Sequence, residues 1–201
     1  MATHKTGECR FIMEVSILFE IALPESVREF LFLWARPTAA LAFILAAWKW
    51  GDWRNWKKYY PTILYVILFD LLYFGLTMDF PLWRYDHSVL RYTYSDFVIA
   101  FIMFPATMLL YLPYQPQEKY KQAGFLLLWV LIYASIELLQ SNIRGMLYYN
   151  GWKYGYSVLF DVLFFTMARL HFKYPLWTFA ISIITVPIVL AMFDFPFKDV
   201  I

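Results

Sequence analysis

The sequence predicts an all-α protein: a polytopic bundle of about six transmembrane helices, preceded by an amino-terminal interfacial helix. Three observations lead to this prediction. The 201 residues are 62 % hydrophobic and only 16 % charged, whereas soluble domains contain about 25 % charged residues. Mostly apolar runs of about 20 residues, the length that crosses a bilayer, recur along the chain. Tryptophans gather at the ends of these runs, where indole rings prefer the headgroup boundary.

The amino-terminal segment, residues 1–29, lies outside the predicted bundle. Within it, residues 11–23 are apolar but too short to cross a membrane, and they carry Glu14 and Glu20. We therefore expect a short helix that lies in the membrane interface or packs against the bundle. Residues 30–201 are expected to form one transmembrane domain, because no break between the apolar runs is long enough to hold a folded soluble domain.

The first half of the bundle contains three predicted spans. They cover residues 30–48, 61–78 and 89–112, and each is an apolar run close to the length that a bilayer requires. The breaks between them read KWGDWRNWKKYYP and DFPLWRYDH, which combine turn-forming residues with charges. These breaks predict loops on alternate sides of the membrane.

The second half contains three further predicted spans. They cover residues 123–143, 155–172 and 175–193, and they are separated by YYNGWKYG and by the tight connection HFKYP. The span over residues 155–172 is the least apolar at its ends. A total of five or seven spans therefore stays open.

The charges of the loops give a weak signal for orientation. The basic residues divide equally between the two sides, so the positive-inside rule gives a tie. Two features break the tie: four basic residues follow the first span closely, and Arg91 and Arg144 are expected to belong to the bundle rather than to the loops. Both termini are therefore expected on the outer side.

Polar residues interrupt the apolar runs at helical spacing. At the end of the fourth span, Glu137, Gln140, Ser141 and Arg144 stand at i, i+3, i+4 and i+7, which puts them in one stripe on a helix. The rest of that helix is compatible with lipid. The ionisable residues of the other spans are Arg36, Asp70, Arg91, Asp96 and Asp161.

The ionisable residues are expected to meet in one layer. At about 1.5 Å per residue, five of them lie about 9 to 12 Å below the same membrane face. These five are Arg36, Asp70, Asp96, Glu137 and Asp161. A charged side chain at the centre of a bilayer costs about 2.5 to 3.5 kcal/mol even on the more lenient scale. We therefore expect the arginines to neutralise the carboxylates inside the bundle. The four acids are Asp70, Asp96, Glu137 and Asp161, and the three arginines are Arg36, Arg91 and Arg144, so one carboxyl has no arginine partner. We expect this carboxyl to be Asp70 and to be protonated near neutral pH.

Two functions from different classes follow from this layer. The first is a small transporter or channel-like protein for protons, a cation or a small polar solute, in which Asp70, Asp96, Glu137 and Asp161 bind or relay the charge. Arg36, Arg91, Arg144 and Gln140 are expected to complete that site. The alternative is a non-transporting membrane scaffold or assembly subunit, in which the same charges only hold the helices together.

Other classes of function find less support in the sequence. The net charge of +2 and the scattered basic residues argue against a nucleic-acid partner. The chain has no GxxxxGK[ST], GxSxG or GxGxxG motif, so we expect no enzyme and no cofactor. It also has no HExxH pair, and we expect no metal site. The expected partners are the lipid bilayer, a small ion or polar solute, and a protein partner or a second copy of the chain.

One segment resembles a known family. The stretch NGWKYGYSVLFDVLFFTMARLHFKYPLW contains Asn150-Gly151-Trp152, then Ser157 and Asp161, then Arg169-Leu170-His171 before Pro175. It resembles the carboxy-terminal part of an uncharacterised family of small polytopic membrane proteins in endospore-forming bacilli. The resemblance implies a bacterial cytoplasmic membrane and draws attention to Trp152, Asp161, Arg169 and His171. The family has no established activity, so the resemblance implies no mechanism.

Overall fold

The computed structural model describes residues 24–85 and 92–197, the side chains of residues 92–94 excepted. The described part of the chain is 78 % helical, which agrees with the predicted all-α class. The predicted interfacial helix over residues 11–23, together with Arg91, lies outside the described residues. The structure therefore leaves both of these predictions open.

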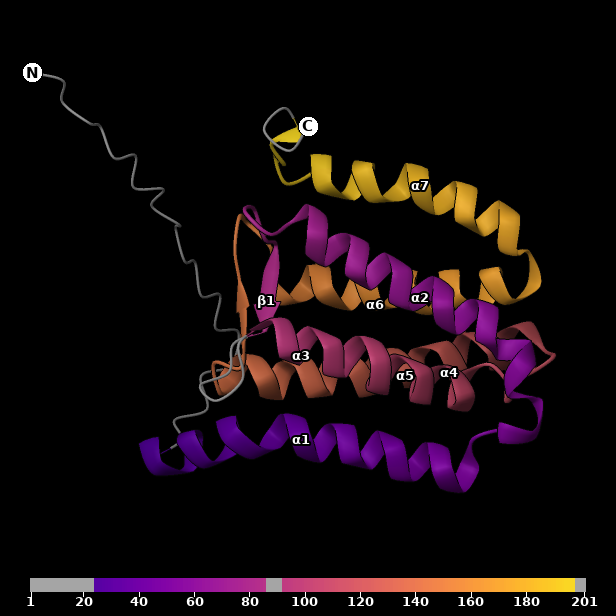
Figure 1. Ribbon diagram of the computed structural model, residues 1–201, viewed down its shortest axis with the longest axis horizontal. Helices are drawn as coiled ribbons and strands as arrows, with labels where there is room; N and C mark the ends of the chain where they lie inside the picture. The colour runs from indigo at the N-terminus through magenta and orange to yellow at the C-terminus, as the bar shows by residue number, and fades with distance from the viewer. Residues whose placement is uncertain (1–23, 86–91, 198–201) are drawn as a thin grey trace, which may run out of the picture.

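Helices form most of the described residues in each of the six predicted apolar runs, and one run contains three consecutive helical pieces. The helices are α1 (Glu25–Trp50), η1 (Trp53–Asn55), α2 (Trp56–Leu76), α3 (Tyr92–Val98), η2 (Ile99–Met103), α4 (Phe104–Tyr111), α5 (Lys119–Asn142), α6 (Tyr154–Lys173) and α7 (Pro175–Ala191). The long segments lie roughly side by side, with α1 and α7 on opposite outer faces (Figure 1). The start of α1 and the end of α7 lie at the same end of the bundle (Figure 1).

A small antiparallel sheet closes that end of the bundle. Strand β1 (Trp83–Tyr85) pairs with strand β2 (Met146–Tyr148), so that Arg84 lies opposite Leu147. The sequence analysis predicted only loops in these places, because strands this short leave no alternating pattern to read. The sheet joins the connection after α2 to the connection after α5. We call this the sheet end of the molecule.

The helical run from α3 to α4 contains a wider turn. Residues Ile99–Met103 form the π-helical piece η2, and Pro105 lies directly after it, in the first turn of α4. Proline has no N–H group, so the carbonyl of Phe101 cannot receive the usual bond from a residue four positions later. A π-helical turn is a common local adjustment to such a break.

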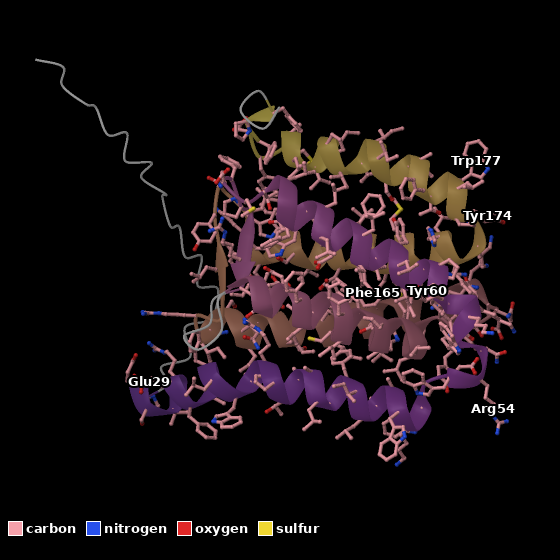
Figure 2. The ribbon with its side chains drawn as sticks, in the orientation of Figure 1. Glu29, Arg54, Tyr60, Phe165, Tyr174 and Trp177 are labelled. Atoms are coloured by element: carbon pink, nitrogen blue, oxygen red, sulfur yellow. The ribbon has the colours of Figure 1, made fainter. Side chains whose placement is uncertain are left out.

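Aromatic side chains fill the core of the bundle. Phe165 on α6 is fully buried, and its ring lies 5.0 Å from that of Tyr111 and 5.0 Å from that of Tyr133. Figure 2 shows Phe165 in the middle of the bundle. The outer helices instead expose large apolar side chains, among them Leu176 at 85 % and Trp177 at 75 % on α7.

Three of the described helical segments are long and apolar enough to cross a membrane. They are Glu25–Trp50, Trp53–Leu76 and Lys119–Asn142, while Ser95–Tyr111 and Pro175–Ala191 are apolar but shorter. By length and composition, these segments indicate an association with a membrane. The crossing of all six segments is taken up below as a proposal.

Candidate functional site

A cavity of about 110 Å³ lies inside the bundle, between α1, α2, α5, α6 and the run from η2 to α4. We call it the central cavity. Much of its wall is apolar, with polar groups from four helices and from the sheet end. Those with charged, amide or hydroxyl side chains are Arg36, Asp70, Tyr85, Tyr133, Glu137, Gln140, Ser157 and Asp161. Five of the residues that the sequence analysis selected thus come together: Arg36, Asp70, Glu137, Gln140 and Asp161.

Arg36 is held in place by contacts from three other parts of the chain. It is only 6 % exposed, and its Nη1 donates a hydrogen bond of 2.7 Å to the Ser95 hydroxyl. Its Nη2 donates a second bond of 2.7 Å to the carbonyl oxygen of Gly145. The guanidinium carbon also lies 5.2 Å from the centre of the Tyr85 ring, within the range of a cation–π contact. The positive charge is therefore fixed at the sheet end of the central cavity.

Glu137 projects from α5 into the same cavity, and a tyrosine of the sheet holds it. The hydroxyl of Tyr148 on β2 donates a hydrogen bond of 2.6 Å to Glu137 Oε1. One turn further along α5, Gln140 is buried, and its side-chain oxygen occupies the space where a Cβ on Gly145 would otherwise lie. The turn after α5 thus has to stay close to the helix, and glycine at position 145 permits it.

The expectation that Arg144 joins the buried layer is wrong. Its side chain is exposed, and its backbone has a φ of 60° in the turn that ends α5. The Gly145 N–H bonds to the carbonyl of Gln140, and the Arg144 N–H bonds to that of Ser141, which is a Schellman motif. Because α5 ends at Asn142, the helical spacing that connects Glu137 to position 144 does not continue that far.

Asp161 faces the central cavity from α6. It is 8 % exposed, and its Oδ2 is buried without a hydrogen-bond partner among the described residues. The charge of Glu137 acts on it across the cavity. One turn earlier on α6, the Ser157 hydroxyl accepts a 2.8 Å hydrogen bond from the indole N–H of Trp152. A buried carboxylate oxygen that lacks a donor is costly, so this oxygen is available to a ligand that brings a proton or a positive charge.

Asp70 stands where three cavities meet. It lines the central cavity, a cavity of about 130 Å³ between α2, α6 and α7, and a cavity of about 220 Å³ beside the connection between α2 and β1. We call the second the lateral cavity and the third the end cavity. Oδ2 of Asp70 is also buried without a hydrogen-bond partner in the described part of the chain. Trp83 is the other residue that lines all three.

Asp96 belongs to the end cavity rather than to the central one. It lies there with Asp70, whose carboxylate is close enough to feel its negative charge. Arg84 and the exposed Asp79 line the same cavity, and the charges of Arg84 and Arg36 act on Asp96. The end cavity is therefore a polar compartment that reaches the surface at the sheet end and contacts the half-buried Asp70.

Several residues of the site carry no signal that sequence reasoning could have used. Ser95 and Tyr148 are common polar residues near the ends of apolar runs, and Gly145 contributes only a backbone carbonyl. Tyr73 and Trp83 belong to the same group, because their positions depend on a sheet that the sequence does not reveal. The resemblance drew attention to His171, which lies toward the other end of α6, where its Nδ1 is 3.0 Å from the Thr62 hydroxyl.

The site differs from a metal centre. Within residues 24–85 and 92–197, no group of three or more His, Cys, Asp or Glu side chains is arranged to hold a metal ion. The carboxylates of Asp70, Glu137 and Asp161 instead line the central cavity from three different helices. Comparisons with protein-family models, with curated proteins and with solved structures found no match for this chain.

Proposed function

We propose that this chain is a multi-pass membrane protein and that its six described helical segments cross the bilayer. The outer surface supports this proposal, because α1 and α7 expose side chains such as Leu41, Ile184 and Trp177 that favour lipid over water. Charged side chains gather at the two ends, with Glu29 at the sheet end and Arg54 at the other (Figure 2). An apolar outside with ionisable groups turned inward is the arrangement that a bilayer favours.

Within that membrane protein, the proposed function is the uptake of protons or a small cation into the central cavity. The observation that carries this proposal is the pair of buried carboxylate oxygens, on Asp70 and Asp161, that face cavities without a hydrogen-bond partner among the described residues. Polar groups buried in a membrane protein mark ion or solute pathways by default. A proton or a cation would supply the missing partner.

The entry route in this proposal begins at the sheet end. The end cavity contains Asp79, Arg84 and Asp96, and it shares Asp70 with the central cavity. A proton that enters the end cavity can pass to Asp70, and from there to Glu137 or Asp161 on the far wall of the central cavity. The carboxylates of Asp70 and Asp96 repel each other when both are charged, and so do those of Asp161 and Glu137. Such pairs favour a shared proton or cation.

The alternative function, a scaffold held together by its charges, predicts a dry layer in which every carboxylate has a partner. Two features favour uptake over this alternative: the volume of the central cavity and the unpartnered oxygen of Asp161. Neither contributes to packing. A group that only stabilises helix contacts gains most from complete hydrogen bonding.

The test uses proteoliposomes that contain a pH-sensitive dye. Wild type, Asp70→Asn and Asp161→Asn are compared under imposed proton and monovalent-cation gradients, and thermal unfolding of each is followed in parallel. The control is Glu118→Gln, which removes an exposed carboxylate that pairs with Lys121 at 2.7 Å and lines none of the three cavities. We expect both Asn variants to fold and to lose most of the proton or cation movement, while the control retains it.

The opposite result is equally clear. A wild type that moves no proton or cation under any gradient, together with Asn variants of unchanged stability, would overturn the uptake proposal. The scaffold function would then be the better account. Because Asn keeps the shape of Asp and removes only the charge, a loss of movement in a folded variant cannot be attributed to packing.

A further inference from the structure

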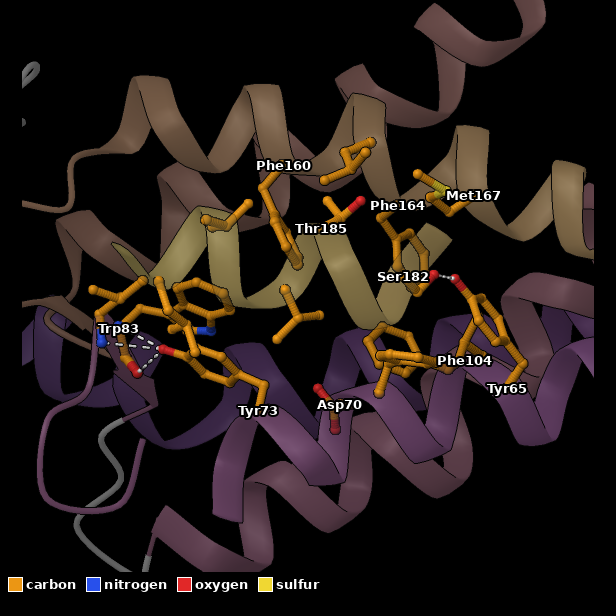
Figure 3. A pocket seen from close by; sticks show the side chains of 17 residues that line it. Tyr65, Asp70, Tyr73, Trp83, Phe104, Phe160, Phe164, Met167, Ser182 and Thr185 are labelled. Carbon is orange, nitrogen blue, oxygen red and sulfur yellow. Dashed lines mark hydrogen bonds between the residues drawn. The ribbon is translucent and has the colours of Figure 1, made fainter. Parts of the chain in front are cut away.

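The lateral cavity has a composition that differs from that of the other two. It lies between α2, α6 and α7, and Figure 3 shows Asp70 near the middle of its wall with aromatic side chains on both sides. Of the described residues that line it, Asp70 alone is ionisable within the physiological range, and none is basic. By contrast, the central cavity contains Arg36 and the end cavity contains Arg84. Of the three cavities, the lateral cavity is therefore the one in which a carboxyl group stands among aromatic side chains and no described lining residue is basic.

We infer that the lateral cavity binds a small organic cation with an apolar body, and that Asp70 is its counter-ion. This inference rests on the proposed function, because Asp70 is also a member of the uptake route. Aromatic ring faces attract a cation, and most strongly where water is excluded. A carboxylate oxygen that is buried without a donor adds the charge complement. A hydrated metal ion gains little from such apolar walls, whereas an alkylammonium group gains from both features.

The aromatic wall beside Asp70 is fixed before any ligand arrives. The rings of Tyr73 and Trp83 stack with their centres 4.0 Å apart. The Tyr73 hydroxyl accepts hydrogen bonds of 3.1 Å from the backbone N–H groups of Leu82 and Trp83 (Figure 3). Phe160 on α6 continues the wall, with its ring 5.2 Å from that of Trp83. A preformed wall lowers the entropy loss on binding.

The far end of the lateral cavity is polar but neutral. There the hydroxyls of Tyr65 and Ser182 lie 2.6 Å apart in a hydrogen bond (Figure 3). Ser182 also donates a bond of 2.9 Å to the carbonyl of Thr178, so this end is already satisfied. Asp70 is consequently the anchor for charge, and the remaining space accepts the apolar body of the ligand.

The size of the lateral cavity limits the ligand to about one ring. Its volume of about 130 Å³ is close to that of an engineered cavity of about 150 Å³ that binds benzene. N-methylpyridinium, a permanent cation that is one methyl group larger than a six-membered aromatic ring, is a suitable probe. A proton and this cation would compete for the same carboxylate of Asp70, so the affinity for the probe should fall as the solution becomes more acidic.

The experiment is titration calorimetry of the purified full chain in detergent micelles, with protein-free micelles as the blank. N-methylpyridinium is compared with toluene, a neutral molecule of the same shape. We expect the cation to bind wild type and the Glu118→Gln control, and to bind Asp70→Asn about tenfold more weakly or not at all. Asp161→Asn should retain binding within about twofold, because Asp161 lines the central cavity and not the lateral one.

A second variant keeps the test valid should Asp70→Asn fail to fold. Val186 on α7 lines the lateral cavity, and Val186→Phe fills the space while it leaves Asp70 in place. It should abolish binding of the cation. Equal binding of the neutral molecule, unchanged binding by Val186→Phe, or an equal loss in Asp70→Asn and Asp161→Asn would each overturn the inference.

The same proteoliposomes separate this inference from the proposed function. Proton or cation movement without binding of N-methylpyridinium overturns the inference alone. Binding that depends on Asp70, in a protein that moves no proton or monovalent cation, overturns the uptake proposal and leaves the ligand site standing. Movement together with Asp70-dependent binding supports both.

Discussion

The Arg36 side chain on α1 donates a hydrogen bond of 2.7 Å to the backbone carbonyl of Gly145, which is 109 residues further along the chain. The same guanidinium bonds the Ser95 hydroxyl on α3 at 2.7 Å. One side chain therefore connects the outer helix α1 to α3 and to the turn after α5. The planar guanidinium can point two donors in different directions, which a lysine ammonium on a flexible stem does less well.

Replacing Arg36 by lysine should destabilise the protein. Lysine keeps the charge but cannot hold both acceptors in the same geometry, and the loss of one buried hydrogen bond to a charged group costs about 1.5 to 3 kcal/mol. Thermal and denaturant unfolding in micelles, followed by circular dichroism, measures the effect. Arg54→Lys, at an exposed position at the other end, is the matched control and should change stability by less than about 0.5 kcal/mol. Equal effects at both positions would contradict the connecting function of Arg36.

Removing the Tyr148 hydroxyl should destabilise the protein, because this hydroxyl donates a hydrogen bond to the Glu137 carboxylate. Tyr148→Phe leaves Glu137 without this 2.6 Å bond, and we expect a loss of about 1.5 to 3 kcal/mol. Tyr154→Phe, which removes a 2.9 Å bond to the neutral carbonyl of Ala134, should cost about 0.5 to 1.5 kcal/mol. Adding Glu137→Gln to Tyr148→Phe should recover part of the loss, since no charge is then stranded. A double variant that equals the sum of the singles would show that the two side chains do not interact.

Arg144 offers a test of the turn that replaces the expected ion pair. An L-residue in the left-handed conformation costs about 1 to 2 kcal/mol, and glycine avoids that cost. Glycine loses more backbone entropy on folding, and this loss offsets about 0.5 to 1 kcal/mol of the strain that is relieved. Arg144→Gly should therefore stabilise the protein by about 0.5 to 1 kcal/mol. Arg144→Ala keeps the strain and should be nearly neutral. A loss of about 3 to 5 kcal/mol in Arg144→Ala would instead indicate that Arg144 neutralises a buried carboxylate, as the sequence analysis expected of the arginines.

The two ends of the bundle should lie on opposite sides of the membrane. In a Cys9→Ser background, which removes the single native cysteine, cysteines are placed at the exposed positions Arg54, Gln117 and Lys153. An impermeant thiol reagent added to intact cells should label position 153 and spare positions 54 and 117. The reverse pattern would invert the orientation, and labelling at all three positions would contradict a spanning bundle.

The loop between α1 and α2 should become less stable in acid. The Tyr59 hydroxyl, and after it the Asn55 amide, donate hydrogen bonds to the Asp52 carboxylate and lower its pKa below the ordinary value of 3.8. Because the pKa is lower in the folded state, the stabilisation is present above the unfolded pKa and is lost as the pH falls through the folded pKa. Unfolding scans at several pH values should show wild type and Asp52→Asn converging as the pH falls through the folded pKa, which lies below 3.8. A stability difference that does not depend on pH would exclude this carboxylate as the cause.

Helix positions were predictable because long apolar runs bounded by turn and charge signals favour helices. The predicted run 155–172, for example, corresponds to α6 at Tyr154–Lys173. Helical spacing also correctly indicated that Glu137 and Gln140 share a face, and both line the central cavity. The same reasoning failed at Arg144, because spacing holds only while the helix continues.

Counting the charged residues in the sequence could not predict the contacts that position the site. Counting ionisable residues considered only carboxylates as partners for Arg36, and it did not predict the hydrogen bonds to the Ser95 hydroxyl and the Gly145 carbonyl. Every residue has such a carbonyl, so no sequence pattern marks the one at Gly145. The cavities depend on how side chains from several helices fill space, and this is a property of packing rather than of any one segment.

The π-helical turn η2 sets the rotational phase between α3 and the helix that follows it. Its turn holds one residue more than an ordinary helical turn, so Ser95 and Asp96 are rotated about 100° relative to an uninterrupted α-helix. Deleting a single residue between Ile99 and Met103 would restore the ordinary turn without shortening the helix appreciably. It would also carry Ser95 away from Arg36 and Asp96 away from the end cavity. The number of residues in this segment, and not only their identity, therefore determines where Ser95 and Asp96 lie in the site.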